Sequence, residues 1–265
     1  MNLKIYQVDA FTNQVFGGNP AAVIPMQNWL PDSVMQTIAA ENNLSETAFF
    51  IPTEGEADFH LRWMTPSIEV NLCGHATLAT AHTLWQHLDF KKNVVTFDSR
   101  SGILKVSRTK TGYTLDFPVD ILRGVTDENE LEIIRNVLKI KPLEVFRGKD
   151  DYMAILPSQA DIENLDPDFI PLRHLDARGL IATAKGDNVD FVSRCFFPEA
   201  GIEEDPVTGS AHTTMVAYWS PKLNKTELAA KQLSKRQGEL NCILAGNRVL
   251  ISGSAVTFMV GEIFI

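Results

Sequence analysis

The segment GHATLATAHTLW, residues 74–85, contains no Asp, Glu, Lys or Arg, and GSAHTTMVAYW, residues 209–219, shares this property. A helix without a charged face is usually buried on all sides, so each segment is predicted to form the central helix of a compact body. Each segment begins with glycine, a polar residue and alanine, and each ends with tryptophan. Because the two segments lie about half a chain length apart, they indicate two similar halves.

The residues before these two segments also match. RWMTP (62–66) precedes the first segment and RCFFP (194–198) precedes the second, and a loop with acidic residues follows each. This order of arginine, proline, glycine and buried helix is a weak internal repeat, which we favour over a chance similarity of short segments. It predicts an α+β protein of two pseudo-symmetric domains, each a mostly antiparallel curved sheet or barrel around a central apolar helix.

Shorter patterns predict the strands and surface helices of each half. Alternating apolar residues predict strands at 3–9, 47–51, 58–63, 103–108 and 113–117. Helical periodicity that follows acidic start residues predicts helices over 31–42 and 127–139. Pro118 precedes the second helix, so the predicted domains are 1–117 and 118–265, with the last few residues free to return to the N-terminal sheet.

Composition argues against several classes of protein. The chain has 265 residues, 22% of them charged, and its formal net charge of -9 is unfavourable for binding nucleic acid or an anionic membrane. No apolar run approaches the roughly 20 residues that span a bilayer. The three cysteines are far apart and odd in number, which argues against a disulfide framework and favours a reducing compartment. A cytoplasmic location is therefore expected. The histidines are scattered along the chain and show no metal-ligand spacing.

The stretch EEDPVTGSAH (203–212) contains residue types that occur in serine nucleophiles and phosphate loops, but its spacing fits neither. A nucleophile elbow requires Gly-x-Ser-x-Gly, and a Walker loop requires a lysine after the glycine. His212 follows Ser210 by roughly 200° around a helix, so it cannot act as the base for that serine. A helix N-terminus remains, and its amides suit a carboxylate or an enolate-like oxygen. A helix cap at Thr208 or Asp205 is the structural alternative.

Residues near the first apolar segment are candidates for chemistry. His75 begins the predicted helix, where the helix dipole favours a neutral imidazole, whereas His82 is interpreted as a core histidine. Cys73 precedes the helix, and a thiol there can act as an acid or base, with a small buried residue as the alternative. Glu46 follows a polar cluster that includes Ser45 and heads an apolar strand, with a solvated loop acid as the alternative.

Four ordered motifs resemble one known family. They are VDAFTNQVFGGNPAAV (8–23), NNLSETAFF (42–50), NLCGHATLA (71–79) and FFPEAGIEEDPVTGSAH (196–212). Together with LDFP at 115–118 and RQG at 236–238, they are similar to the phenazine-biosynthesis (PhzF-like) isomerases, which share the diaminopimelate-epimerase fold. The resemblance runs over essentially the whole chain. It implies an active site in a cleft between two domains, no metal, no organic cofactor, and a homodimer.

The resemblance also implies roles for individual residues. Glu46 matches the glutamate that moves a proton between carbon atoms of a small carboxylate or amino-acid-like substrate, and His75, Asp205 and Ser210 match the other polar catalytic positions. The implied substrate-binding residues are Asn19, Ser45, Cys73, Gly74, Thr208 and Gly209. Epimerases of this fold use two cysteines, and Thr208 stands where the second would be. A one-base proton shift by Glu46 is therefore favoured.

These observations predict a cofactor-independent isomerase that uses Glu46 as general base and acid. Two alternatives stay open. One is a ligand-binding or protein-interaction protein that kept the fold and lost turnover. The other is an epimerase that uses Cys73, with Glu46 as the opposite base. The identity of the substrate does not follow from the sequence.

Overall fold

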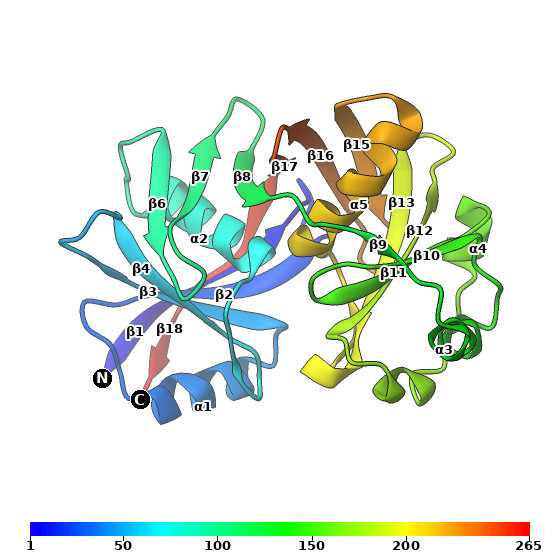
Figure 1. Ribbon diagram of the computed structural model, residues 1–265. Coiled ribbons are helices and arrows are strands. Elements are labelled where there is room, and N and C mark those ends of the chain that lie inside the picture. The colour runs from blue at the N-terminus through cyan, green and yellow to red at the C-terminus, as the bar shows by residue number, and fades with distance from the viewer. The chain divides into compact units, whose positions relative to one another are not determined.

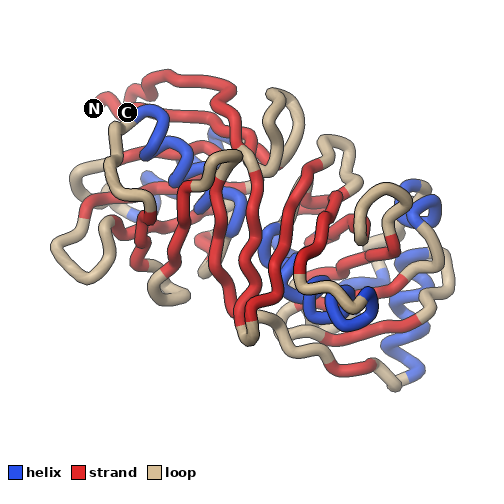
Figure 2. The backbone as a smooth tube through the Cα atoms, turned by 90° about the horizontal axis from the view of Figure 1, so that it is seen from above, coloured by secondary structure: helices blue, strands red, loops and turns tan.

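The computed structural model describes residues 1–265, except for the side chain of Ala200, and the chain divides into two compact units. Unit 1 comprises Met1–Phe117 and Ile251–Ile265, and unit 2 comprises Pro118–Leu250. The two chain ends belong to the same unit and lie side by side in both views (Figures 1 and 2). The Ile265 amide donates a hydrogen bond to the Met1 carbonyl oxygen at 2.9 Å.

Unit 1 contains a sheet in which the last strand of the chain lies beside the first. β18 (Ala255–Phe264) pairs antiparallel with β1 (Asn2–Ala10), and the pairing extends from Asn2 opposite Phe264 to Ala10 opposite Ala255. The other elements of the unit are β2 (Asn19–Pro25), α1 (Asp32–Asn42), β3 (Glu46–Pro52), β4 (Phe59–Met64), β5 (Glu69–Val70), α2 (Gly74–His87), β6 (Val94–Asp98), β7 (Leu104–Arg108) and β8 (Tyr113–Pro118). The return of β18 ties both chain ends into one core.

Unit 2 contains its own set of paired strands and the longer of the two apolar helices. Its elements are β9 (Arg123–Gly124), α3 (Glu128–Leu138), β10 (Glu144–Arg147), β11 (Asp151–Ile155), α4 (Gln159–Glu163), β12 (Gly179–Lys185), β13 (Phe191–Phe197), β14 (Ile202–Asp205), α5 (Gly209–Leu223), β15 (Glu227–Gln232) and β16 (Gly238–Ala245), with short 3-10 turns at Pro171–His174 and Pro198–Ala200. β17 (Arg248–Gly253) carries the chain from unit 2 back into unit 1.

The two units share one pattern of strand pairing. In unit 1 the pairs β2–β3, β3–β4, β4–β6 and β6–β7 are parallel, antiparallel, parallel and antiparallel in turn. In unit 2 the pairs β11–β12, β12–β13, β13–β15 and β15–β16 follow the same sequence. This duplication confirms the predicted α+β class with two similar halves of mostly antiparallel sheet.

Helix α2 is buried along its whole apolar segment, as its lack of charged side chains predicts. Every residue from Gly74 to Trp85 is buried. Thr77, Thr80 and Thr83 each donate their hydroxyl to the carbonyl oxygen four residues earlier. Because these hydroxyls are hydrogen-bonded within the helix, burying them carries little of the usual cost of an unpaired polar group.

Helix α5 is the corresponding buried helix of unit 2. It packs against β11, β15 and β16, and it buries Ala211, Met215 and Val216. Trp219 near its end donates Nε1–H to Thr183 Oγ1 at 3.0 Å, so the indole is tied to β12. Within the described part of the chain, no helix is long and apolar enough to cross a membrane.

The surface helices begin and end close to their predicted limits. Helix α1 buries Met35, Ile38 and Ala39 on one face. Helix α3 is capped by Asp127, whose carboxylate accepts hydrogen bonds from the backbone amides of Asn129 and Glu130. A side-chain cap of this kind typically contributes about 1 kcal/mol to the stability of a helix. Neither central helix has such a cap: Cys73 and Thr208 occupy the N-cap positions without a side-chain capping bond.

Candidate active site

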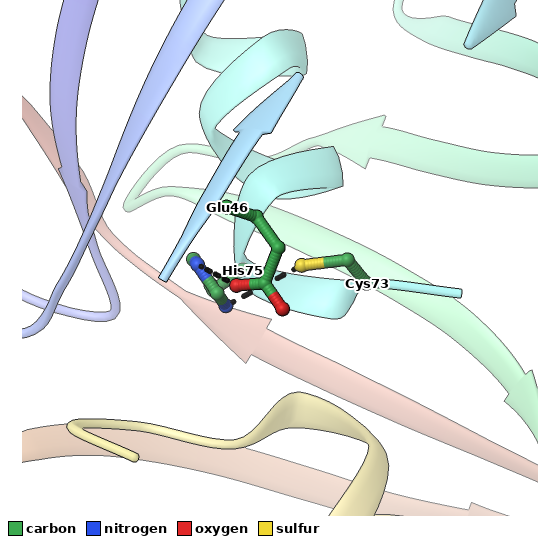
Figure 3. A group of neighbouring side chains, drawn as sticks. All are labelled: Glu46, Cys73 and His75. Atoms are coloured by element: carbon green, nitrogen blue, oxygen red, sulfur yellow. Dashed lines mark hydrogen bonds and ion pairs between the residues drawn. The ribbon is translucent and has the colours of Figure 1, made fainter. Parts of the chain in front are cut away.

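A cluster of Glu46, Cys73 and His75 lies at the N-terminus of α2 in unit 1 (Figure 3). Glu46 is the first residue of β3, Cys73 is the N-cap of α2, and His75 is in the first turn of that helix. His75 Nε2 lies 3.2 Å from Glu46 Oε2, and His75 Nδ1 lies 3.5 Å from Cys73 Sγ. The imidazole ring therefore stands between the thiol and the carboxylate.

His75 is neutral in this environment. Its side chain is 4% exposed, and burial lowers the pKa of the imidazole to about 3. The Asn19 side-chain amide donates to His75 Nδ1 at 3.1 Å, so Nδ1 is an acceptor and the ring proton lies on Nε2, facing Glu46. The Nε2–Oε2 contact has the distance of a hydrogen bond but not its angular geometry. Such contacts commonly tighten only when substrate binds.

Parallel strand pairing brings Asn19 and Glu46 to the same edge of the sheet. β2 begins at Asn19, β3 begins at Glu46, and Ala21 lies opposite Glu46 in the register of this pair. Helix α2 packs against both strands, so its N-terminus meets this edge. The strand starts and the helix start therefore converge, although Asn19 and His75 are far apart in the sequence.

In unit 2, Asp205 and Thr208 form a second polar cluster before α5. Thr208 donates its hydroxyl to Asp205 Oδ2 at 2.5 Å, and both residues are 6% exposed. Gln232 at the end of β15 donates to the Asp205 carbonyl oxygen at 2.7 Å and accepts from the Thr208 amide at 2.8 Å. Gln232 is fully buried and fixes the loop that leads to Gly209. No local sequence motif marks this glutamine, so its role could not be recognised from the sequence.

Arg178 adds a positive charge beside Ser210. Its Nη2 donates to Ser210 Oγ at 3.3 Å, and the guanidinium binds Asp151 through Nε–Oδ1 at 2.9 Å and Nη2–Oδ2 at 2.5 Å. The guanidinium carbon Cζ lies over the ring of Phe197, 4.8 Å from the ring centroid. Burial by itself would lower the pKa of Arg178, but Asp151 outweighs this effect and raises it, so the guanidinium is charged. Arg178 was also missed by the sequence analysis.

A bidentate ion pair holds the turn before each central helix. Arg62 of β4 binds Glu69 through Nε at 2.8 Å and Nη2 at 2.7 Å. Arg194 of β13 binds Glu204 in the same way, at 2.7 Å and 2.9 Å. Fork-to-fork pairs of this kind are strong and geometrically specific. The matching arginines of RWMTP and RCFFP therefore have one structural role, which is to position the approach to each helix start.

Strand register identifies the unit 2 counterpart of Glu46. Trp63 lies opposite Ala48, and its counterpart Cys195 lies opposite Ile181. Ala48 of β3 therefore corresponds to Ile181 of β12. Counting back two residues along each strand, Glu46 corresponds to Gly179. Counting back one more, Ser45 corresponds to Arg178. A Cβ atom at Gly179 would lie 2.2 Å from the Phe196 carbonyl oxygen, which no ordinary contact allows. Unit 2 thus carries an arginine beside its strand start and no side chain at the position of the carboxylate.

His82 is outside the candidate site. Its Nδ1 lies 3.0 Å from the Tyr113 hydroxyl and its Nε2 lies 2.8 Å from Thr257 Oγ1, and burial lowers the pKa of the imidazole to about 4. The interpretation of this residue as a satisfied core histidine is confirmed.

Comparisons with known proteins agree with this fold. The profile of the family described as phenazine biosynthesis-like protein matches residues 8–261. An uncharacterized isomerase of Pseudomonas aeruginosa is 48% identical, with 99% of each chain covered, and one of Halalkalibacterium halodurans is 46% identical over the whole of both chains. The crystal structure of a PhzF-family phenazine biosynthesis protein from Enterococcus faecalis superposes with a TM-score of 0.94 at 45% identity, covering all of both chains.

A more distant similarity shows the fold alone. A hydroxyproline epimerase from Agrobacterium vitis, solved with bound trans-4-hydroxy-L-proline, superposes with a TM-score of 0.65 at 8% identity, covering 99% of this chain and 92% of the epimerase. Fold and relatives together define the class, an isomerase-type enzyme with an epimerase-like fold. Within that class, the chain belongs to the PhzC-PhzF family of phenazine biosynthesis-like proteins.

Proposed function

We propose that the protein is a cofactor-independent isomerase that moves a proton between carbon atoms of a small carboxylate or amino-acid-like metabolite. The observation that carries this proposal is the placement of Glu46. Its carboxylate is 12% exposed and lies beside the neutral His75 at the N-terminus of a buried helix. A largely desolvated carboxylate at such a position can both take and return a proton.

In the proposed reaction, Glu46 removes a proton from a carbon atom next to a carboxylate or carbonyl group. The C–H electron pair moves into the adjacent C–C bond, and negative charge develops on oxygen. Amides in the first turn of α2, at Gly74, His75 and Ala76, have no acceptor within the helix and can stabilise that charge. Glu46 then returns the proton to a different carbon, so no proton is gained or lost overall.

His75 and Asn19 are proposed to hold Glu46 rather than to exchange protons with the substrate. The Asn19 amide keeps the ring proton on Nε2, the ring nitrogen that lies 3.2 Å from Glu46 Oε2. This orientation leaves the other carboxylate oxygen available for proton transfer. A general acid–base group positioned in this way typically contributes about 10²–10⁴-fold to the rate.

Residues at the start of α5 are proposed to bind the polar groups of the substrate. Ser210 accepts a hydrogen bond from Arg178, which leaves its own hydroxyl proton available for a substrate oxygen. The charged guanidinium favours a carboxylate there. Asp205, which accepts a hydrogen bond from Thr208, is suited to a substrate amine or hydroxyl. Ser45, Cys73 and Gly209 remain proposed substrate contacts.

An epimerase that uses Cys73 is the second candidate, because Cys73 Sγ lies 3.5 Å from His75 Nδ1 and shares the cluster with Glu46. Two points favour the one-base isomerase. Thr208 occupies the N-cap position of α5 that Cys73 occupies in α2. Gly179, the register counterpart of Glu46, has no space for a side chain. A symmetric pair of bases therefore has no support from unit 2.

We also expect a homodimer. Met259 and Val260 of β18 are exposed, and the exposed rings of Phe16 and Phe258 lie 5.7 Å apart in an edge-to-face contact. An apolar surface of this kind commonly marks a protein interface. Size-exclusion chromatography with light scattering of the wild type and of Phe258→Ser measures the association state. A monomeric wild type would contradict this expectation.

The function is tested by C–H exchange in deuterated water, followed by NMR over a panel of small carboxylates and amino acids. The panel includes trans-4-hydroxy-L-proline, the ligand of the structural relative. Wild-type protein should introduce deuterium into at least one compound and convert it to an isomer. Glu46→Gln should keep the fold and lose both activities. Cys73→Ala should keep both with a higher KM, because Cys73 is proposed to contact the substrate and not to transfer the proton. Equal exchange by Glu46→Gln would refute the proposed base, and loss of activity in Cys73→Ala would favour the epimerase.

A further inference from the structure

We propose that Glu46, Cys73 and His75 bind a thiophilic divalent cation, represented by Zn²⁺, and that this ion inhibits the enzyme. Each residue offers one ligand atom, and these three atoms lie within 4.8 Å of one another (Figure 3). A carboxylate oxygen, a thiolate and an imidazole nitrogen are the ligand types that zinc takes in proteins. Three protein ligands would leave a fourth position for water.

The distances suit a tetrahedral ion once the Asn19 amide, which donates to His75 Nδ1 at 3.1 Å, turns away from that nitrogen. Zinc–sulfur and zinc–nitrogen bonds of about 2.3 and 2.0 Å place tetrahedral ligand atoms roughly 3.5 Å apart. Cys73 Sγ and His75 Nδ1 already lie 3.5 Å apart. Glu46 Oε2 faces the other ring nitrogen at 3.2 Å, so a side-chain rotation of Glu46 completes the set.

The charges of the three ligands also favour the site. The first-turn amides of α2 make a helix N-terminus unfavourable for a cation. Two negatively charged ligands, the Glu46 carboxylate and the Cys73 thiolate, offset this and neutralise the ion. His75 Nδ1 accepts a hydrogen bond from the Asn19 amide and so carries no proton, and it releases none when it binds the ion. Binding converts the Cys73 thiol to a thiolate and releases that one proton to solvent.

The ion would act as an inhibitor and not as a resident cofactor. It would engage the Glu46 carboxylate, which the proposed reaction needs free to accept a proton. The inhibition therefore rests on the proposed function, whereas metal binding itself does not. A substrate carboxylate and the ion would compete, so added Zn²⁺ should raise the apparent KM and a chelator should restore it.

The test uses the full-length protein and Zn²⁺ alone. Equilibrium dialysis with elemental analysis should find one tightly held zinc per chain, and Cys73→Ser should bind it at least about 10-fold more weakly. Co²⁺ should give thiolate-to-cobalt charge-transfer absorption that Cys73→Ser lacks. Cys242→Ala is the matched thiol control, because that thiol is buried in β16. His82→Gln tests whether zinc binds instead at the other pair of neighbouring histidines. His82 Nε2 and His87 Nε2 each lie 2.8 Å from Thr257 Oγ1.

The outcomes separate the two proposals. Binding of one zinc per chain that is weakened in Cys73→Ser supports the metal site. This conclusion holds even if the protein shows no exchange activity, and in that case only the proposed function fails. The proposed site is refuted if Cys73→Ser binds zinc as tightly as the wild type does. It is also refuted if zinc binding is lost in His82→Gln and not in Cys73→Ser. The absence of stoichiometric binding overturns it as well. Binding at Cys73 without any effect on an active enzyme overturns the inhibitory role.

Discussion

Gly179 in unit 2 is the register counterpart of Glu46 in unit 1. The two positions begin equivalent strands, but one carries a carboxylate and the other has no room for a Cβ atom. The residue before each position differs as well, with Ser45 in unit 1 and the charged Arg178 in unit 2. The two equivalent strand starts therefore differ in chemistry, which agrees with the proposal that β3 supplies the proton-transfer group and that β12 supplies a charge for binding an anion.

Gly179→Ala should destabilise the protein by about 1–3 kcal/mol, the usual cost of forcing extra atoms into a packed site. The new Cβ would lie 2.2 Å from the Phe196 carbonyl oxygen, so the backbone must shift. Gly124→Ala is the matched control, because no atom lies within 4 Å of its added Cβ. Urea unfolding measures both. Equal stability of the two variants would show that β12 tolerates a side chain at this position.

Asn19→Asp should raise the pKa of His75. In the wild type, burial holds that pKa at about 3, so His75 should not titrate between pH 5 and 8. A carboxylate 3.1 Å from Nδ1 would favour the charged imidazolium and compete for the ring proton now facing Glu46. Imidazole nitrogen shifts in NMR report both states. The wild type should show a neutral ring protonated on Nε2, and a wild-type His75 that titrates near pH 6.5 would contradict this.

Arg178→Gln should weaken binding of a carboxylate substrate about 10–100-fold, because a charge-assisted hydrogen bond contributes roughly 1.5–3 kcal/mol. The loss should appear mainly in KM, with Arg178→Lys intermediate. Arg173→Gln is the control, because the side chain of Arg173 is 74% exposed. Since Arg178→Gln also leaves Asp151 without its guanidinium, thermal unfolding must accompany the kinetics. Unchanged KM in a folded Arg178→Gln variant would exclude a role in binding.

Gln232→Ala should cost about 2–4 kcal/mol of stability. It would leave the buried Thr208 amide and Asp205 carbonyl without their partners, and each such group costs about 1–3 kcal/mol. The loop before α5 should also exchange its amide hydrogens faster. Gln27→Ala, at an exposed position, should change stability by less than about 0.5 kcal/mol. A Gln232→Ala variant as stable as Gln27→Ala would refute this role for Gln232.

Stability should fall as the pH drops from 6.5 toward 4. Burial lowers the pKa of both His82 and His212 to about 4, below the usual 6.5. Within this window the unfolded chain binds protons that the folded protein does not, so acid favours unfolding. The slope is at most about 1.4 kcal/mol per pH unit for each histidine. Urea unfolding at pH 7 and pH 5 should show a smaller difference for His82→Gln than for the wild type.

The central helices and the class of fold could be predicted because their signals are local. Residues 74–85 and 209–219 lack charged side chains, and a helix of that composition must be covered on all sides. Glu46 and His75 could be selected as candidates because each lies in a motif at the start of an element. The proton position on His75 could not be predicted, because it depends on Asn19, which reaches the ring only because α2 packs against β2.

The sequence by itself determined the two apolar helices, the arginine-proline repeat before them and the residue types at each helix start. These features depend on neighbours within a few positions, so composition and spacing are enough to reveal them. Only the tertiary structure decided that Arg178, which pairs with Asp151, adjoins Ser210 and that Gln232 supports Thr208. It also decided that Gly179 excludes a second carboxylate. Each of these relationships joins segments distant in the chain, and it exists only where strand register brings their atoms within a few ångströms.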